Sequence, residues 1–130
     1  MAFNIKKILT VILVTLSFNV WALNSVEIEK QYSYEAKQST SISRGEKFFT
    51  VKHGKEWSCA SCHGAPPVKE GKHVSTDKII SPLAPAFNGK RFTDEAKVNK
   101  WFKRNCNDVL SRECTSLEKA DVMAYLNSLK

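Results

Sequence analysis

Apolar residues recur at helical spacing near the C-terminal end of the chain. Thr115-Ser-Leu-Glu118 has the form of a capping box, in which a threonine and a glutamate satisfy backbone N–H groups at a helix start. An apolar series at intervals of about three to four follows it, made up of Leu117, Ala120, Val122, Met123, Leu126 and Leu129. This spacing predicts a C-terminal helix with a buried apolar side.

A second amphipathic stretch begins near Thr93, which we expect to cap a helix with Asp94 and Glu95 in its first turn. Its apolar face ends in an asparagine, since the positions i, i+3, i+4 and i+7 are occupied by Val98, Trp101, Phe102 and Asn105. The Asn105 carboxamide either points toward the group that packs against this apolar face, or Asn105 is merely the C-cap of the helix. The spacing does not separate these two interpretations.

The N-terminal half of the domain is less clearly patterned. Ser43-Arg-Gly-Glu46 has capping-box form and predicts a helix over about 44–52 that carries Gly45, Phe48 and Phe49. Residues 23–42 form either a short helix or an extended arm. Residues 64–92 hold all four prolines and three of the five glycines, which predicts a long irregular loop. We see no strand alternation and no internal repeat.

The first 22 residues have the features of a cleaved export signal. Lys6 and Lys7 precede an apolar run over 8–20, and Ala22 supplies a small residue at the cleavage position. A retained membrane anchor is the alternative, but a span needs about 20 apolar residues. We therefore expect a signal peptide at 1–22 and a mature domain at 23–130 with its core at about 43–130. This implies a periplasmic protein without stable membrane insertion after cleavage.

The chain is basic, with a formal net charge of +7 at pH 7, and loss of the two leader lysines would reduce this to +5. The basic residues are scattered among acidic ones, without the dense run that follows a phosphate backbone. Nucleic acid is therefore not an expected partner. The surface is either simply solvated or a mildly basic face that docks an acidic protein.

One short motif points to a cofactor. Cys59-Ala-Ser-Cys62-His63 is the C-x-x-C-H pattern of covalent haem attachment. On one helical turn, the two thiols can reach two vinyl groups of one porphyrin, and the adjacent imidazole can bind the iron. A thioredoxin-like site would need a βαβ setting, and a zinc site would need another spacing in the second cysteine pair. We predict one haem c with His63 as the proximal ligand.

Cys106 and Cys114 remain after the haem has taken the first pair. Export makes free thiols rare, so we expect a disulfide between them. Three helices around a C-x-x-C-H predict an all-α domain similar to the class I c-type cytochromes. In that class, a glycine and an aromatic residue of the N-terminal helix cross the C-terminal helix. The likeness implies Gly45 and Phe49 against Tyr125.

The usual second iron ligand of a class I cytochrome is a methionine before the last helix, and this chain has none there. Met1 lies in the leader, and Met123 lies at a core-like position of the last helix. His53 and His73 are candidates, although a surface position is the commoner fate of such histidines. Asn105 is the third candidate, because it ends an apolar face that could lie against haem.

Six motifs accompany these residues: "CASCHG", "ISPLAP", "RFTD", "KWFKRNCN", "REC" and "EKAD". Together they resemble the sphaeroides haem protein (SHP) family of high-spin class I cytochromes, over 59–64 and most of 79–121. The resemblance implies that Asn105 is the distal ligand and moves away to admit small diatomic ligands. It also supports the Cys106–Cys114 disulfide and implies a dihaem cytochrome c and a membrane cytochrome b as redox partners.

We therefore expect a monohaem cytochrome that binds O₂, NO or CO at reduced iron and exchanges electrons with partner cytochromes. Val98, Trp101 and Phe102 would form an apolar wall at the haem. By likeness to the proline loop of class I cytochromes, a carbonyl of Ser81-Pro82-Leu83 would accept from the second ring nitrogen of His63. A six-coordinate electron carrier and a reductase of O₂ or nitrogen oxides are the alternatives. Enzymatic activity is left open, because no acid–base group is evident.

Overall fold

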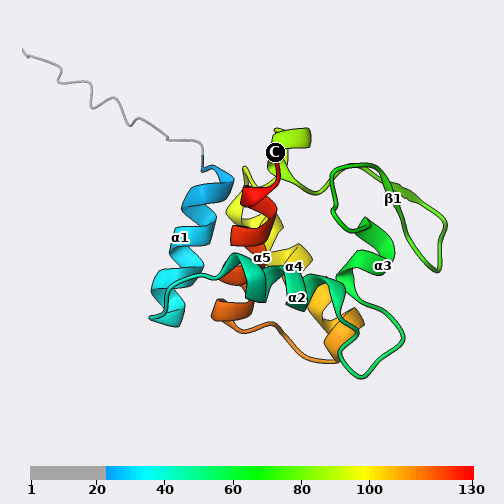
Figure 1. Cartoon of the computed structure of the whole chain (residues 1–130), viewed down its shortest axis with the longest axis horizontal. Coiled ribbons are helices and arrows are strands. Elements are labelled where there is room, and N and C mark those ends of the chain that lie inside the picture. The colour runs from blue at the N-terminus through cyan, green and yellow to red at the C-terminus, as the bar shows by residue number, and fades with distance from the viewer. Residues whose placement is uncertain (1–22) are drawn as a thin grey trace, which may run out of the picture.

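The computed structural model describes residues 23–130. In chain order its elements are α1 (Ser25–Ala36), α2 (Ile42–Thr50), α3 (Cys59–His63), β1 (Gly71–Lys72), β2 (Ile79–Ile80), the 3-10 helix η1 (Pro85–Phe87), α4 (Glu95–Leu110) and α5 (Ser116–Ser128) (Figure 1). The expected signal peptide at 1–22 lies outside the described residues. None of the helices in this described part is long and apolar enough to span a membrane.

Helix α5 is the centre of the helical core. All of its residues from 120 to 126 are buried, and both α1 and α2 pack against it (Figure 1). The capping box predicted at Thr115 is present and starts the helix. The all-α class I-like fold is therefore confirmed. The core cluster, as we call it below, consists of Ile28, Tyr32, Phe49, Val98, Ala120, Val122, Met123, Tyr125 and Leu126.

Helices α2 and α5 cross at Gly45. A Cβ atom at this position would overlap the backbone carbonyl of Asp121 and lie 3.1 Å from the Cβ of Tyr125. Only glycine lacks a Cβ, so only glycine permits this approach. One turn further on, the ring of the buried Phe49 lies 5.6 Å from the ring of Tyr125. The crossing that the class I likeness implied is confirmed.

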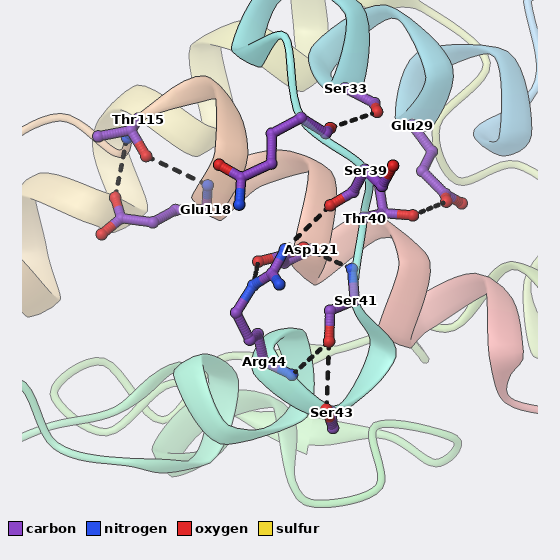
Figure 2. Close-up of polar contacts among 11 residues, drawn as sticks. Glu29, Ser33, Ser39, Thr40, Ser41, Ser43, Arg44, Thr115, Glu118 and Asp121 are labelled. Carbon is purple, nitrogen blue, oxygen red and sulfur yellow. Dashed lines mark hydrogen bonds and ion pairs between the residues drawn. The ribbon is translucent and has the colours of Figure 1, made fainter.

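A buried carboxylate joins the start of α2 to α5 (Figure 2). Asp121 accepts hydrogen bonds from Arg44 Nε at 2.7 Å and Nη2 at 3.0 Å. It also accepts from the backbone N–H of Ser41 at 2.7 Å. Asp121 is only 4% exposed, and these three donors offset the cost of burying its charge.

This network explains why α2 starts earlier than predicted. Its N-cap is Ser41, whose hydroxyl accepts from the backbone N–H of Arg44 at 3.3 Å. The predicted cap at Ser43 is wrong, because that hydroxyl instead pairs with the hydroxyl of Ser41 at 3.1 Å. The partner that favours Ser41 is Asp121, which lies 80 residues further along the chain. Short-range sequence pattern could not show it.

The predicted start of α4 is also wrong by one residue. Its N-cap is Asp94, whose carboxylate accepts from the backbone N–H of Lys97 at 3.1 Å. The hydroxyl of Thr93 instead donates to the carbonyl of Lys90 at 3.3 Å. A carboxylate is the stronger acceptor at the positive end of a helix, so it takes the capping position.

The end of α4 decides one of the alternatives for Asn105. The helix continues to Leu110, and its C-cap is Ser111 in the left-handed conformation. Asn105 therefore lies within the helix, and its interpretation as a C-cap is wrong.

Residues 23–42, for which a short helix and an extended arm were both considered, contain helix α1. Asn24 starts it with a capping box. Its two buried side chains, Ile28 and Tyr32, lie one turn apart and belong to the core cluster. The Tyr32 hydroxyl donates to Asn99 of α4 at 2.7 Å. The packed core thus begins before residue 43.

The helix crossing yields a prediction about stability. Gly45→Ala should raise intrinsic helix propensity by about 1 kcal/mol. The overlap with Asp121 should outweigh this and destabilise the protein by about 2 kcal/mol or more, since two packed helices must separate. Denaturant unfolding of the haem-loaded protein measures the effect. Glu46→Ala, at the exposed neighbouring position, is the control. A Gly45→Ala protein as stable as the control would contradict the crossing.

Candidate haem site

Helix α3 carries the whole C-x-x-C-H motif. Ser58 caps the helix through a reciprocal capping box with Ser61, which satisfies the backbone N–H groups of both serines. Cys59 and Cys62 are free thiols, and His63 is the last residue of the helix. Two thiols and one imidazole are thus presented by a single short helix.

Burial controls the protonation of these groups. It raises the pKa of the Cys59 thiol to about 11, so the thiol is neutral at pH 7. Burial is also the first cause that lowers the pKa of His63 to about 4, followed by the charges of Arg91 and His73. His63 is therefore neutral at pH 7, which is the form that binds iron. Its ring lies 6.2 Å from the ring of Phe49, beside the helix crossing.

The loop after α3 folds back onto it. A Cβ at Gly71 would overlap the carbonyl oxygen of Cys62 and lie 3.0 Å from the Cα of His63. Gly71 belongs to β1, which pairs with β2 in an antiparallel ladder of two residues each. The segment predicted to be wholly irregular therefore contains a short ladder whose close approach supports the end of α3.

The loop expected to face His63 is held by other donors. The Pro82 carbonyl accepts from Arg91 Nε at 3.0 Å and from Asn88 Nδ2 at 3.3 Å. Leu83 packs against the core cluster. Within residues 23–130, no hydrogen bond joins the His63 ring to this loop, so that contact stays a prediction.

Helix α4 brings its apolar face to the same core. Val98 is buried, and Phe102 packs edge-on against Tyr32 with ring centroids 5.7 Å apart. Trp101 is 51% exposed. Asn105 is partly buried, and its side chain makes no hydrogen bond within the described part of the chain. A carboxamide in this state is available to an additional binding partner.

The residue after Asn105 is anchored covalently. Cys106 and Cys114 form a disulfide with a Cα–Cα distance of 5.6 Å. Both residues are buried, and Cys114 directly precedes Thr115, the cap of α5. The disulfide therefore ties the Asn105 turn to the most buried helix of the domain.

The other candidate iron ligands have contacts elsewhere. The Nε2 atom of His53 lies 2.7 Å from the carbonyl oxygen of Phe48, and the two rings lie 4.5 Å apart. The Nδ1 atom of His73 accepts from the backbone N–H of Ser75 at 3.3 Å. Met123 is fully buried in the core cluster. Each of these histidines has one engaged ring nitrogen, whereas neither polar atom of the Asn105 carboxamide has a hydrogen-bond partner within the described residues.

These donors fit haem c. Within residues 23–130, no three His, Cys, Asp or Glu side chains are grouped to bind a metal ion directly. Two free thiols and a neutral imidazole on one helix match the two thioether bonds and the proximal bond of a c-type haem. Partly buried apolar side chains surround the core cluster, among them Cys59, Leu83, Phe92 and Phe102. The fold and the site define a small helical c-type cytochrome with covalently bound haem c.

The chain belongs to the family described as a domain of unknown function, DUF1924, whose model matches residues 35–126, and to the SHP family that its motifs resemble. It is 47% identical over 93 residues to cytochrome c'' of Methylophilus methylotrophus, a match that covers 68% of this chain and 65% of the relative. It is 52% identical over 69 residues to the c-type cytochrome SHP of Cereibacter sphaeroides, which is 53% of each chain. The matches thus span about two thirds and about half of these relatives.

Solved structures of the same two proteins share the fold. Oxidised SHP, described as an oxygen-binding cytochrome c, has a TM-score of 0.78 at 38% identity over 84% of this chain and 100% of its own. Oxidised cytochrome c'' has a TM-score of 0.74 at 39% identity over 82% and 95%. A solution structure of cytochrome c'', described in terms of haem-ligand detachment, has a TM-score of 0.71 at 39% identity over 81% and 93%.

The cysteine assignment yields a prediction about attachment. Acidified acetone should leave haem on the wild-type chain, and Cys59→Ala or Cys62→Ala should weaken its retention, since each loses one thioether. The matched control is the double variant Cys106→Ala, Cys114→Ala. It should keep the haem and lose about 2–3 kcal/mol of stability. Haem that is extracted freely from the wild-type protein would contradict the assignment.

Proposed function

We propose that this monohaem cytochrome is a periplasmic electron-transfer protein that binds O₂ or NO at its reduced haem. Cys59 and Cys62 hold the haem, His63 is the proximal ligand, and Asn105 is a weak, displaceable distal ligand. When bound, the haem supplies an iron that changes between the ferric and ferrous states and that can take a diatomic ligand. Mass spectrometry of the exported protein, expected to begin at Leu23, tests the leader on which the compartment rests.

The state of Asn105 carries this proposal. It lies in the middle of α4, it is partly buried, and its carboxamide has no hydrogen-bond partner within residues 23–130. A carboxamide oxygen that no group of the protein holds is free to act as a ligand to iron. The disulfide at Cys106 fixes the adjacent turn and limits the movement of the helix. A rotation of the Asn105 side chain, without movement of the helix, would then be enough to admit or exclude a small ligand at a bound haem.

The chemistry of a carboxamide suits displacement. Its oxygen is a hard donor, which favours ferric over ferrous iron, so reduction should weaken the bond. After rotation, the amide N–H₂ can donate a hydrogen bond to a bound diatomic ligand. The described properties of the two relatives, oxygen binding in SHP and haem-ligand detachment in cytochrome c'', support this role.

Apolar side chains on α4 would keep water from the same position. Val98 is buried, and Phe102 and Trp101 are partly exposed, so they are available to cover a porphyrin face. A site of this polarity excludes water and protons from a bound ligand, while the single carboxamide supplies the polar contact.

The distribution of charge supports a redox partner with an acidic face. Residues 23–46 and 105–130 each contain one more acidic than basic residue. The whole positive excess of the domain therefore lies in 47–104, the segment that carries the haem motif and most of α4. Such asymmetry steers an acidic partner toward the haem. A dihaem cytochrome c and a membrane cytochrome b are the partners that the family resemblance implies.

The alternatives are less well supported. In a six-coordinate carrier, Nδ1 of His53 or Nε2 of His73 would bind the iron while the other ring nitrogen keeps its present contact. Within the described residues, no observation specifically favours a reductase of O₂ or nitrogen oxides.

The ligand assignment predicts a change in the ferric spectrum. Asn105→Ala should make ferric iron five-coordinate or water-bound, which shifts the absorption spectrum. CO should bind the reduced protein faster or more tightly, roughly tenfold if the asparagine occupies the site nine-tenths of the time. Asn105→Met should bind ferrous iron more firmly, raise the reduction potential and block CO.

The control for this series is Asn107→Ala. Asn107 is exposed on the same helix and its amide donates to the Lys103 carbonyl at 2.9 Å. This variant should keep the wild-type spectrum and CO kinetics. If Asn105→Ala behaves in the same way as Asn107→Ala, Asn105 is not the ligand, and His53 or His73 becomes the candidate.

The proposed partner contact predicts a salt-dependent rate. Electron transfer from a reduced dihaem cytochrome c should slow about tenfold between about 0.01 and 0.1 M ionic strength, since the Debye length falls from about 30 to about 10 Å. Stopped-flow absorbance measures this rate. Lys100→Glu on α4 should slow it further at low salt, whereas Lys130→Glu, outside the basic segment, should not. A rate independent of salt would argue against charge steering.

A further inference from the structure

Helix α4 is attached to the rest of the described chain mainly through individual side chains. Within residues 23–130, α5 packs closely along α1 and α2, whereas α4 shares no comparably extensive packing with another element. Its apolar face joins the core cluster through Val98, and the disulfide at Cys106 fixes its C-terminal part. The position of the turns between these two residues therefore depends on the other side chains that reach α4.

Tyr32 of α1 makes two of these contacts. Its hydroxyl donates to Asn99 Oδ1 at 2.7 Å. Its ring meets the ring of Phe102 edge-on, with centroids 5.7 Å apart and planes at 90°. Asn99 and Phe102 are three positions apart, so they are neighbours on the surface of α4. The preceding residue of α1, Gln31, donates to Glu95 at 2.7 Å in the first turn of α4.

Tyr32 is itself firmly held. Only 2% of it is exposed, and it belongs to the core cluster. The ammonium of Lys119 on α5 lies over its ring, 4.9 Å from the centroid, where a cation is attracted to the ring face. Burial, followed by the charges of Glu35 and Glu95, raises the pKa of Tyr32 to about 12, so the hydroxyl keeps its proton at neutral pH. Tyr32 thus joins α4 to the packed pair of α1 and α5.

We propose that Tyr32 is a positioning residue for the distal ligand, because it holds α4 where Asn105 can bind the iron. Phe102 lies about one turn before Asn105, and Cys106 directly follows it. The asparagine therefore lies between the turn that Tyr32 contacts and the disulfide. Since a carboxamide is a weak ligand, its bond to iron depends on a helix position that other contacts maintain. The inference rests on the role proposed above for Asn105.

The test is Tyr32→Phe in the haem-loaded protein, because this variant loses the hydroxyl and keeps the ring. A typical hydrogen bond corresponds to about a fivefold change in an equilibrium, so the ratio of Asn105-bound to open reduced sites should fall about fivefold. If the asparagine is bound about nine-tenths of the time in the wild-type protein, CO should bind about three- to fourfold faster. Asn99→Ala, which removes the acceptor, should have a similar effect. Flash photolysis of the CO complex measures these rates.

A second background separates positioning of the ligand from general loosening of the pocket. The distal ligand is already absent in Asn105→Ala, so the addition of Tyr32→Phe should not accelerate CO binding further. An equal acceleration in both backgrounds would overturn the proposal, because Tyr32 would then control access without acting through Asn105. Wild-type CO kinetics in Tyr32→Phe, with a loss of stability alone, would also overturn it, since the role of Tyr32 would be purely structural.

Two control variants leave the contact with α4 intact. Tyr34→Phe makes the same chemical change on α1, at a side chain that is 86% exposed. Ser116→Ala removes a hydrogen bond of 3.0 Å from α5 to Glu35 of α1. Both should keep wild-type CO kinetics. An acceleration in either control as large as that in Tyr32→Phe would contradict a specific role for the contact with α4.

The results distinguish failure of this inference from failure of the ligand assignment. If Tyr32→Phe does not retain haem, Asn99→Ala decides: faster CO binding supports the proposal, and wild-type kinetics contradict it. If Asn105→Ala itself has the wild-type spectrum and CO kinetics, the ligand assignment fails and the role of Tyr32 fails with it. If Asn105→Ala binds CO faster and Tyr32→Phe does not, only the role of Tyr32 is refuted.

Discussion

The close approach of α2 and α5 at Gly45 is the constraint on which the rest of the structure depends. With no side chain between the backbones, α2 meets the carbonyl of Asp121 directly. This places Phe49 between Tyr125 of α5 and the ring of His63. The same turn of α5 offers the Asp121 carboxylate to Arg44 and Ser41, which fixes where α2 begins (Figure 2). One glycine thus sets the position of the element that leads into the haem motif.

The two elements of the candidate site are stabilised by neighbouring parts of the chain. Helix α3 has five residues and is held by its capping box and by β1, whose Gly71 lies against its backbone. Asn105 is held by a longer helix and by the disulfide that links it to α5. The proposed proximal ligand therefore lies on a short capped helix, whereas the proposed distal ligand is a side chain on a helix that a disulfide anchors. This division suits a haem that keeps one ligand and exchanges the other.

Much of the site could be predicted from the sequence because its chemistry is local. The haem motif lies within five consecutive residues, and the Thr115 capping box adjoins an apolar helical series, so both have short-range patterns. The start of α2 could not be predicted, because Asp121 selects Ser41 over Ser43 across 80 residues. The end of α4 was left open, because the spacing could not separate a C-cap at Asn105 from an internal position; the helix continues to Leu110. The contacts of Arg91 could not be predicted, since its partners are backbone carbonyls in an irregular loop.

The central claim is that reduction weakens the bond from Asn105 so that a diatomic ligand can displace it, and the absorption spectrum of the reduced wild-type protein tests this claim most directly. We expect the addition of CO to change the haem bands strongly, because Asn105 leaves and CO takes its place. The ferric protein should not respond, since CO binds only ferrous haem. A reduced spectrum that stays the same at saturating CO would show a firmly bound sixth ligand and contradict a displaceable asparagine.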